Sequence, residues 1–485
     1  MSSPLSDVGG IRTKGRWLAQ RGYPLFVGAA LLCSTECGIN KSSGSASTSG
    51  SPGAQSGSTG LNPASGASGS AATSGSSVAG STATSGSSVA GSIASSGSAP
   101  ASGASASGSI GAAGASSGGS TSSGTVDGGV AAVDGGNGFN GPVFYTAMND
   151  GTLYAYQEGS WALLGKWSGL PITDAARGID ADPATGTIYI SHGGAGPAST
   201  GAKSPNGGLL AWSAITNSIV YDVSFTHGVD QISFGGGEVY IPSGEYTNDT
   251  NWYYVQASNG MELGSEPGGK NPHDTIYRNT HRYYGGTQDT FLYILGLNSS
   301  PITKVGPSPS GTAGVRPFTV NASETRVYVT WSNFRGFSVG DVTTGKLLST
   351  VNFGNNSCGL AAPSHGMSLA PDGSELYVLD TCLNQVKVYD SSDTPQLKAA
   401  IQLAHNIQPG QENPCVWDCN RDGWITHSRD GKYVYIGDSG DVIDTATHQP
   451  ATYLPNLNNC RHGFIELDWS NGVVVGTPSH VGLGY

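Results

Sequence analysis

Five side chains that can bind a ligand or a metal ion recur at one position of a repeated pattern. A histidine or arginine stands twelve residues before the tyrosine of an apolar segment at His365, Arg177 and Arg316. The sequence His-Gly followed by an apolar run puts His462 at the same position, and His273 falls within one residue of it. Equivalent positions of a repeat occupy equivalent places in a fold, so we expect these side chains to converge.

The residue types at this position favour two kinds of ligand. Imidazoles of His273, His365 and His462 around one point suit zinc or copper, with an open fourth position for catalysis. The guanidiniums of Arg177 and Arg316 instead suit a carboxylate, phosphate or sulfate, because a positive charge beside a divalent cation is unfavourable. A third interpretation is that the side chains only fill a channel and satisfy backbone groups of neighbouring elements. The residue types leave all three interpretations open.

One segment matches the first half of a calcium-binding loop. Asp418, Asn420 and Asp422 alternate before a glycine, so their oxygens could face one ion. The twelfth position is Arg429, where a bidentate acid would be required. An aspartate-rich turn is therefore the expected structure, with calcium as the alternative.

The elements that carry these residues are predicted to be strands. After Gly141, short runs rich in Val, Ile and Tyr alternate with Asp-Gly, Asn-Gly, Gly-Gly and Thr-Gly turns, and no sustained helical period appears. Copies of one strand, turn and tyrosine-containing strand begin near residues 177, 229, 273, 316, 364, 424 and 462. Their spacing of roughly 37 to 60 residues is typical of four-stranded propeller blades. We therefore predict an all-β, seven-bladed β-propeller.

The two ends of this region are expected to share the closing blade. Strands are predicted over 142–148, 152–156 and 161–167, before the first copy, and over two segments after His462, the second at Val473–Val475. Joining both termini in one blade removes open sheet edges. At the ring position the second copy offers Val229 or Asp230. His427 lies deeper in its predicted strand, where we expect a core histidine between blades.

Three segments carry a family resemblance. Thr325–Thr330 reads Thr-Arg-Val-Tyr-Val-Thr, and the turns Pro371–Gly373 and Arg429–Lys432 precede tyrosine-containing strands. Over about 141–485 the chain resembles the YVTN or YncE-like propeller repeat, which implies a bacterial, exported propeller. Related propellers include binding proteins, streptogramin lyases, lactonases and copper-dependent oxidases and reductases, so the resemblance leaves activity open. The leading hypothesis is binding of a polar or anionic ligand in the channel. The alternatives are a metal-dependent enzyme, of oxidoreductase or lyase and lactonase type, and a protein-interaction scaffold.

Residues 1–40 are interpreted as an export signal. Four basic residues precede an apolar run over 25–32, which is too short to span a bilayer as a helix. Cys33 directly follows this run, as in a bacterial lipoprotein signal, although Leu32 is not the small residue such signals favour. We therefore expect an outer-membrane or periplasmic lipoprotein, or free secretion, with membrane contact only through a lipid on Cys33.

Residues 41–140 are predicted to be a disordered linker. From Ser42 to about Thr125, roughly seven in eight residues are Ser, Gly, Ala or Thr, too little apolar surface to offset ordering entropy. The formal net charge of -12 excludes the strongly basic surface typical of nucleic-acid binding. Partners are therefore expected to be a small polar or anionic ligand or an envelope protein, and the propeller, 141–485, is expected to be a monomer.

Five cysteines fall in the predicted propeller: Cys358, Cys382, Cys415, Cys419 and Cys460. In an oxidising compartment they can form disulfides, and the odd number leaves at least one without a partner in the domain. Buried, reduced cysteines are the alternative. Cys415 and Cys419 could be a disulfide or a pair of zinc ligands.

Overall fold

The computed structural model describes residues 138–197, 199, 201–297 and 302–477. Their regular structure consists of strands and two short 3₁₀ turns, η1 (Thr381–Leu383) and η2 (Leu457–Asn459). The predicted export signal, Cys33 and nearly all of the predicted linker lie outside the described residues. The described part of the chain contains no helix with the length and apolar character that crossing a membrane requires.

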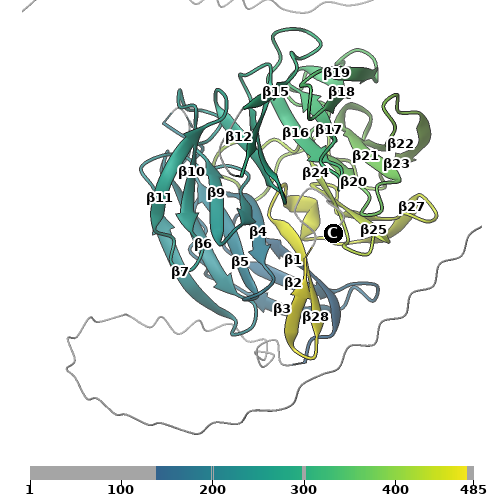
Figure 1. Cartoon of the computed structure of the whole chain (residues 1–485). Coiled ribbons are helices and arrows are strands. Elements are labelled where there is room, and N and C mark those ends of the chain that lie inside the picture. The colour runs from purple at the N-terminus through teal and green to yellow at the C-terminus, as the bar shows by residue number, and fades with distance from the viewer. Residues whose placement is uncertain (1–137, 198, 200, 298–301, 478–485) are drawn as a thin grey trace, which may run out of the picture. The chain divides into compact units, whose positions relative to one another are not determined.

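Seven antiparallel sheets surround one axis as propeller blades, which confirms the predicted fold class (Figure 1). From inner to outer strand, blade 1 contains β4 (Ala176–Asp182), β5 (Thr187–Gly193), β6 (Gly207–Ser213) and β7 (Ser218–Ser224). Blade 2 contains β8 (Ser233–Gly235), β9 (Glu238–Pro242), β10 (Asn251–Gln256) and β11 (Glu262–Pro267). Blade 3 contains β12 (Pro272–Tyr277), β13 (His281–Gly286), β14 (Leu292–Gly296) and β15 (Thr303–Val305).

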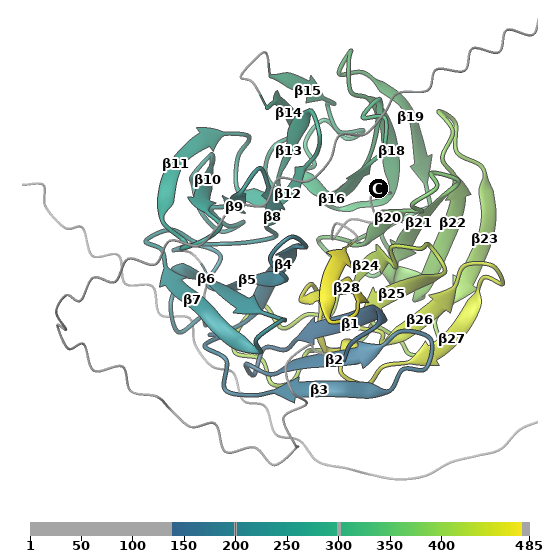
Figure 2. The same cartoon turned by 60° about the horizontal axis from the view of Figure 1, so that its bottom comes forward.

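The next three blades follow the same order around the axis (Figure 2). Blade 4 contains β16 (Val315–Val320), β17 (Arg326–Trp331), β18 (Phe334–Asp341) and β19 (Leu347–Asn352). Blade 5 contains β20 (Met367–Leu369), β21 (Glu375–Asp380), β22 (Gln385–Asp390) and β23 (Leu397–Gln402). Blade 6 contains β24 (Trp424–His427), β25 (Tyr433–Gly437), β26 (Asp441–Asp444) and β27 (Gln449–Tyr453).

The closing blade joins the two ends of the propeller region, as predicted. Its inner strand is β28 (Phe464–Ser470), followed outward by β1 (Gly141–Ala147), β2 (Leu153–Gln157) and β3 (Leu163–Trp167). The last strand, β29 (Val473–Gly476), does not take the second position that the repeat pattern indicates for Val473–Val475. It pairs with the opposite edge of β28, because β1 already pairs with β28 along Gly141–Thr146.

Tyrosines of the second strands hold neighbouring blades together. Tyr189, Tyr328 and Tyr377 are nearly fully buried, each opposite a residue of its own inner strand. The ring of Tyr189, for example, stacks on Phe234 of blade 2 at 5.6 Å between centroids. Aromatic side chains suit this place because each buries a large apolar area and keeps a polar end for a hydrogen bond. This recurrent contact explains the periodic tyrosine in the sequence.

His427 lies between blades 5 and 6 and is fully buried, which confirms that it is a core histidine. Its Nδ1 lies 2.7 Å from Oγ of Ser368 in β20. Its ring packs edge-on against Tyr377, with 4.8 Å between centroids. The side chain therefore joins two inner strands away from the channel mouth.

Candidate functional site

The five residues of the repeated ring position line one pocket at the axis. Arg177, His273 and Arg316 lie at the starts of β4, β12 and β16, and His365 and His462 stand two residues before β20 and β28. All inner strands begin at this end of the channel, so one register position in each blade faces the same space. The pocket has a volume of about 120 Å³.

Loops between strands complete the wall of this axial pocket. Glu245 and Tyr246 come from the β9–β10 loop, and Leu360–Ala362 from the β19–β20 loop. The remaining lining residues are Asp418, Asn420 and Asp422 of the β23–β24 loop and Arg461, the neighbour of His462. Repeat alignment assigns one residue per blade, so it missed Glu245 and Arg461. The adjacency of Arg461 to His462 was the one available signal.

Arg177 is the centre of a buried ion-pair network. Its Nη2 lies 3.1 Å from Asp230 Oδ1 and 3.1 Å from Glu245 Oε1, and its Nη1 donates to Asp418 Oδ2 at 2.9 Å. The guanidinium also lies over the ring of Trp417, 5.0 Å from its centroid. Of the two candidates for the second blade, Asp230 is therefore the residue that reaches the axial network.

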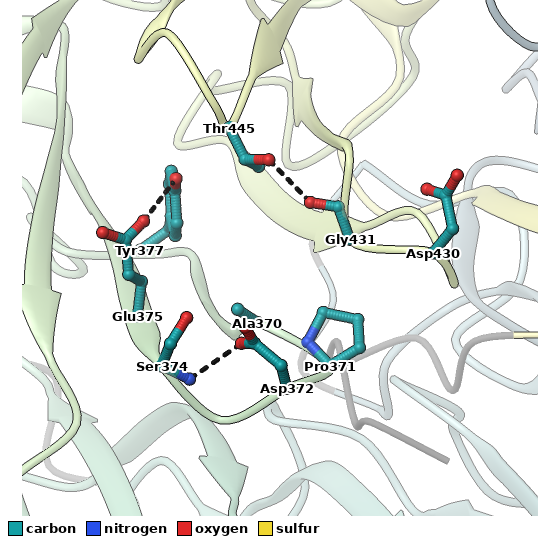
Figure 3. Close-up of a pocket in the computed structure, with 9 residues that line it drawn as sticks. All are labelled: Ala370, Pro371, Asp372, Ser374, Glu375, Tyr377, Asp430, Gly431 and Thr445. Carbon is teal, nitrogen blue, oxygen red and sulfur yellow. Dashed lines mark hydrogen bonds between the residues drawn. The ribbon is translucent and has the colours of Figure 1, made fainter.

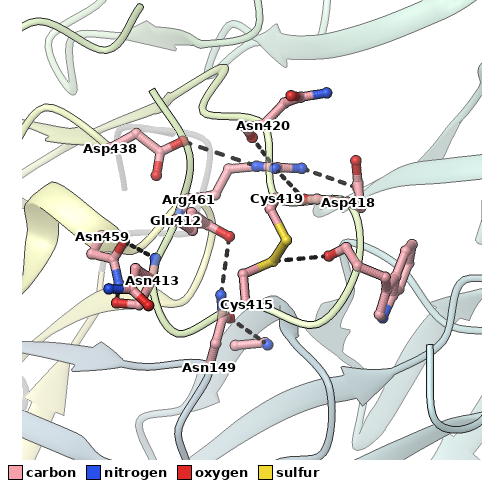
Figure 4. The surroundings of a disulfide bond; sticks show 12 residues. Asn149, Glu412, Asn413, Cys415, Asp418, Cys419, Asn420, Asp438, Asn459 and Arg461 are labelled. Atoms are coloured by element: carbon pink, nitrogen blue, oxygen red, sulfur yellow. Dashed lines mark hydrogen bonds and ion pairs between the residues drawn. A yellow bond between two sulfur atoms is a disulfide. The ribbon is translucent and has the colours of Figure 1, made fainter. Parts of the chain in front are cut away.

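Arg461 neutralises the acids of the predicted calcium loop. Its Nη1 donates to Asp418 Oδ2 at 3.1 Å (Figure 4). Its Nε lies 3.0 Å from Asp422 Oδ1. Its Nη2 donates to the backbone carbonyls of Asp418 and Asn420. Two of the carboxylates predicted as calcium ligands, those of Asp418 and Asp422, therefore pair with an arginine side chain in this structure.

Arg316 has fewer ionic partners than Arg177 or Arg461. Its Nη1 donates to Glu245 Oε2 at 3.0 Å, and its Nε donates to Ser332 Oγ at 3.0 Å. The side chain keeps 13% of its surface exposed, against 3% for Arg177. Among the described residues, no hydrogen bond from Nη2 of Arg316 is found. This arginine has a donor left for a ligand.

Two histidines are oriented through Nδ1. Nδ1 of His273 lies 3.0 Å from Asp230 Oδ2, and Nδ1 of His365 lies 2.9 Å from the carbonyl oxygen of Gly423. Because a carbonyl only accepts, His365 carries its proton on Nδ1, and Nε2 presents a lone pair. Nε2 of His273 and Nε2 of His462 are buried without a hydrogen-bond partner in the described part of the chain.

The pKa values of the three histidines shift in different directions. Burial by itself lowers the pKa of His273, but Asp230 and Glu245 outweigh burial, and the net pKa is raised. Burial lowers the pKa of His365 to about 4, since the opposing effect of Asp422 is smaller. Burial and then the charge of Arg461 lower the pKa of His462 well below its ordinary value. At neutral pH, His365 and His462 are therefore uncharged.

The residues that could hold a metal ion differ from the three histidines predicted from the sequence. His365 lies between the other two histidines, with ring centroids 5.8 Å from His273 and 5.4 Å from His462. Over the described ranges, the one group of three potential ligand atoms within 4.8 Å is that of Asp230, Glu245 and His273. Arg177 contacts both carboxylates of that group, so its positive charge already occupies the place of a cation.

Two disulfides brace loops at the pocket rim. Cys358 and Cys382 link the β19–β20 loop to η1, and Cys415 and Cys419 close a short turn in the β23–β24 loop (Figure 4). The disulfide alternative therefore holds for Cys415 and Cys419. Cys460 is the fifth cysteine, and its thiol is buried and free.

A second pocket lies at the other ends of the inner strands, between blades 5 and 6 (Figure 3). Its volume is about 230 Å³, and its acids already have partners. Glu375 contacts Lys398 and His448, and Asp430 contacts Lys432. The axial pocket is the stronger candidate because it combines charged side chains from several blades with buried nitrogens that lack partners.

Comparison with known proteins identifies the class of fold. No protein-family model matches the chain, and neither does any curated protein. A functionally unknown protein from Desulfotomaculum acetoxidans matches at a TM-score of 0.53 with 10% identity, covering 68% of this chain and all of that one. A chain of the mitotic checkpoint complex matches at a TM-score of 0.46 with 10% identity, and the match covers 61% of this chain and 80% of that one. The first similarity supports a seven-bladed β-propeller and, at this identity, nothing more.

Proposed function

We propose that this propeller is a binding protein of YVTN or YncE-like type whose axial pocket holds a small polar or anionic ligand. The observation that supports this proposal is the pair of buried nitrogens, His273 Nε2 and His462 Nε2, that lack partners beside a polar pocket. A buried polar atom without a hydrogen bond is unfavourable by about 1–3 kcal/mol, so such atoms are normally satisfied by a ligand, ion or water.

The binding test uses the purified full-length chain and a library of small polar and anionic compounds. We expect at least one compound to raise the melting temperature, because a ligand at a hundred times its Kd stabilises the folded state by about 2.7 kcal/mol. Arg316→Met and His365→Asn should weaken this ligand by about tenfold or more in calorimetry. Arg326→Met, at an ion pair that is partly exposed, is the control that should bind normally.

Two results would contradict this proposal. One is the absence of any binding compound, and the other is a ligand that both pocket variants bind with the affinity of the wild-type chain. Metal analysis of the same samples separates the enzyme alternative. Zinc or copper at one equivalent, lost on Asp230→Asn or His273→Gln, would favour a metal centre built on Asp230, Glu245 and His273.

We further propose that the chain is exported and tethered to the cell envelope through a lipid on Cys33. The support is the basic segment and apolar run that end at this cysteine. Cells fed an alkyne-labelled fatty acid should label the wild-type chain and not the Cys33→Ala chain, which should appear in the soluble or secreted fraction. Equal labelling of both chains would contradict lipidation at Cys33, and an unlabelled chain in the medium would favour free secretion.

A further inference from the structure

The free hydrogen-bonding atoms of the axial pocket define the chemistry of its ligand. Most charges there are already paired, since Arg177 and Arg461 each contact three carboxylates. A ligand can therefore form hydrogen bonds only with the atoms that remain without partners, because the paired charges largely cancel one another. Among the described residues, four side chains that line the pocket carry such atoms, and they are Arg316, His273, His365 and His462.

Two of these groups can donate to an anion. Nη2 of Arg316 makes no hydrogen bond to the described residues, and the side chain borders the pocket. His273 directs Nδ1 to Asp230, so a proton on Nε2 is its remaining donor. Glu245 accepts a hydrogen bond from Arg316, and its charge raises the pKa of His273. The donors of Arg316 and His273 therefore lie beside one carboxylate. A carboxylate of the ligand can accept from two such donors at once.

The third group is an acceptor. His365 is 2% exposed, and its Nδ1–H donates to the carbonyl of Gly423, which leaves the lone pair of Nε2. Its ring centroid is 5.8 Å from that of His273, so a ligand between them can reach both. An ionised carboxylate has no hydrogen to give to this nitrogen, whereas a hydroxyl has one. The donor pair and the acceptor thus require different groups on one small molecule.

We propose that the ligand is a small hydroxycarboxylate, with its carboxylate bound by Arg316 and His273 and its adjacent hydroxyl donating to Nε2 of His365. This inference rests on the proposed function and specifies the ligand class for the same pocket. The volume of about 120 Å³ admits a molecule of several non-hydrogen atoms. The ligand is therefore a free small acid.

Three matched probes test the two groups separately in calorimetry with the full-length chain. They are 2-hydroxypropanoate, propanoate, which lacks the hydroxyl, and propane-1,2-diol, which lacks the carboxylate. We expect 2-hydroxypropanoate to bind about tenfold more tightly than propanoate, as one buried hydrogen bond predicts. The diol should show no measurable binding, because the charged donors then lack an anion.

Variants assign each group to a residue. His365→Asn places an amide where Nδ1–H contacts Gly423 and removes the Nε2 acceptor. It should make 2-hydroxypropanoate and propanoate bind equally while propanoate keeps its wild-type affinity. Arg316→Met should weaken both acids by about tenfold to a hundredfold, as expected for a charged hydrogen bond. In His365→Asn, damage to the fold would instead weaken both acids together. In Arg316→Met, a melting temperature without ligand equal to that of the wild type shows that the fold is intact, and Arg326→Met controls for loss of a surface arginine.

The outcomes separate this inference from the proposed function. Equal wild-type affinity for 2-hydroxypropanoate and propanoate would overturn the hydroxyl contact, and tighter binding of the diol would overturn the carboxylate contact. If none of the three binds while another compound binds in an Arg316-dependent way, the ligand class is wrong and the proposed function stands. If no polar compound binds at all, the proposed function fails as well.

Discussion

Replacing Arg177 by methionine should lower the free energy of unfolding by about 3–5 kcal/mol. Methionine matches much of the length of the arginine stem but leaves Asp230, Glu245 and Asp418 close together without their shared cation. Removing one partner of a buried ion pair leaves uncompensated charge in a medium that solvates it poorly. Urea denaturation of the two full-length proteins at neutral pH measures the difference.

A matched surface variant sets the scale for this effect. Arg326 pairs with Asp341 and Asp393, whose side chains are 19% and 55% exposed, so Arg326→Met should lower the unfolding free energy by less than about 1 kcal/mol. Adding Asp230→Asn to Arg177→Met should restore part of the loss, because one of the three unpaired charges disappears. Equal losses for Arg177→Met and Arg326→Met would show that the axial network does not contribute to stability.

Acidification should destabilise the wild-type chain more than the His427→Asn chain. Burial lowers the pKa of His427 to about 3, despite the opposing effects of Asp372 and Glu375. In the unfolded chain a histidine keeps its ordinary pKa of about 6.5. The unfolded state therefore takes up a proton first, so this stability is present above pH 6.5 and is lost as the pH falls.

The expected loss from this histidine between pH 6.5 and pH 4.5 is about 2 kcal/mol. Asparagine places an oxygen near the position of Nδ1, where it can accept from Ser368, and it does not titrate. The free energies of unfolding of both proteins are measured in urea at pH 7.5, 6.5, 5.5 and 4.5. Between pH 6.5 and pH 4.5 the wild-type value should fall relative to that of His427→Asn by this amount. All other titrating groups are common to the two proteins and cancel in the difference. Parallel curves would show that His427 accepts its proton in the folded state at an ordinary pH.

Much of the axial site followed from the repeat alone. Arg177, His273, Arg316, His365 and His462 line one pocket because each stands where an inner strand begins. The carboxylates that pair with the arginines were harder to foresee. Glu245 lies in a loop after β9, held by a hydrogen bond of 2.7 Å from Asn271 Nδ2 to its backbone carbonyl. No periodic pattern places a loop residue over an axis formed by other blades.

The closing blade shows the same limit for strand pairing. Alternating apolar residues and turn signals were sufficient to identify β28, β29 and β1 to β3 as strands of one sheet. These signals did not predict the order of the strands in the sheet. The repeat pattern assigns the second position to Val473–Val475, whereas β1 occupies it. Hydrogen bonding between strands that are far apart in the chain depends on which edge is free once the ring closes.

Local chemistry thus determined the strands, the blade count and the identity of the side chains at the channel mouth. These properties depend on short-range alternation, on turn residues and on one tyrosine per repeat, all of which stand in the sequence. The charge balance of the pocket was decided only by tertiary structure. Arg177 meets Asp418 across 241 positions of the chain, and the partner of each buried charge is set by how loops of different blades pack together.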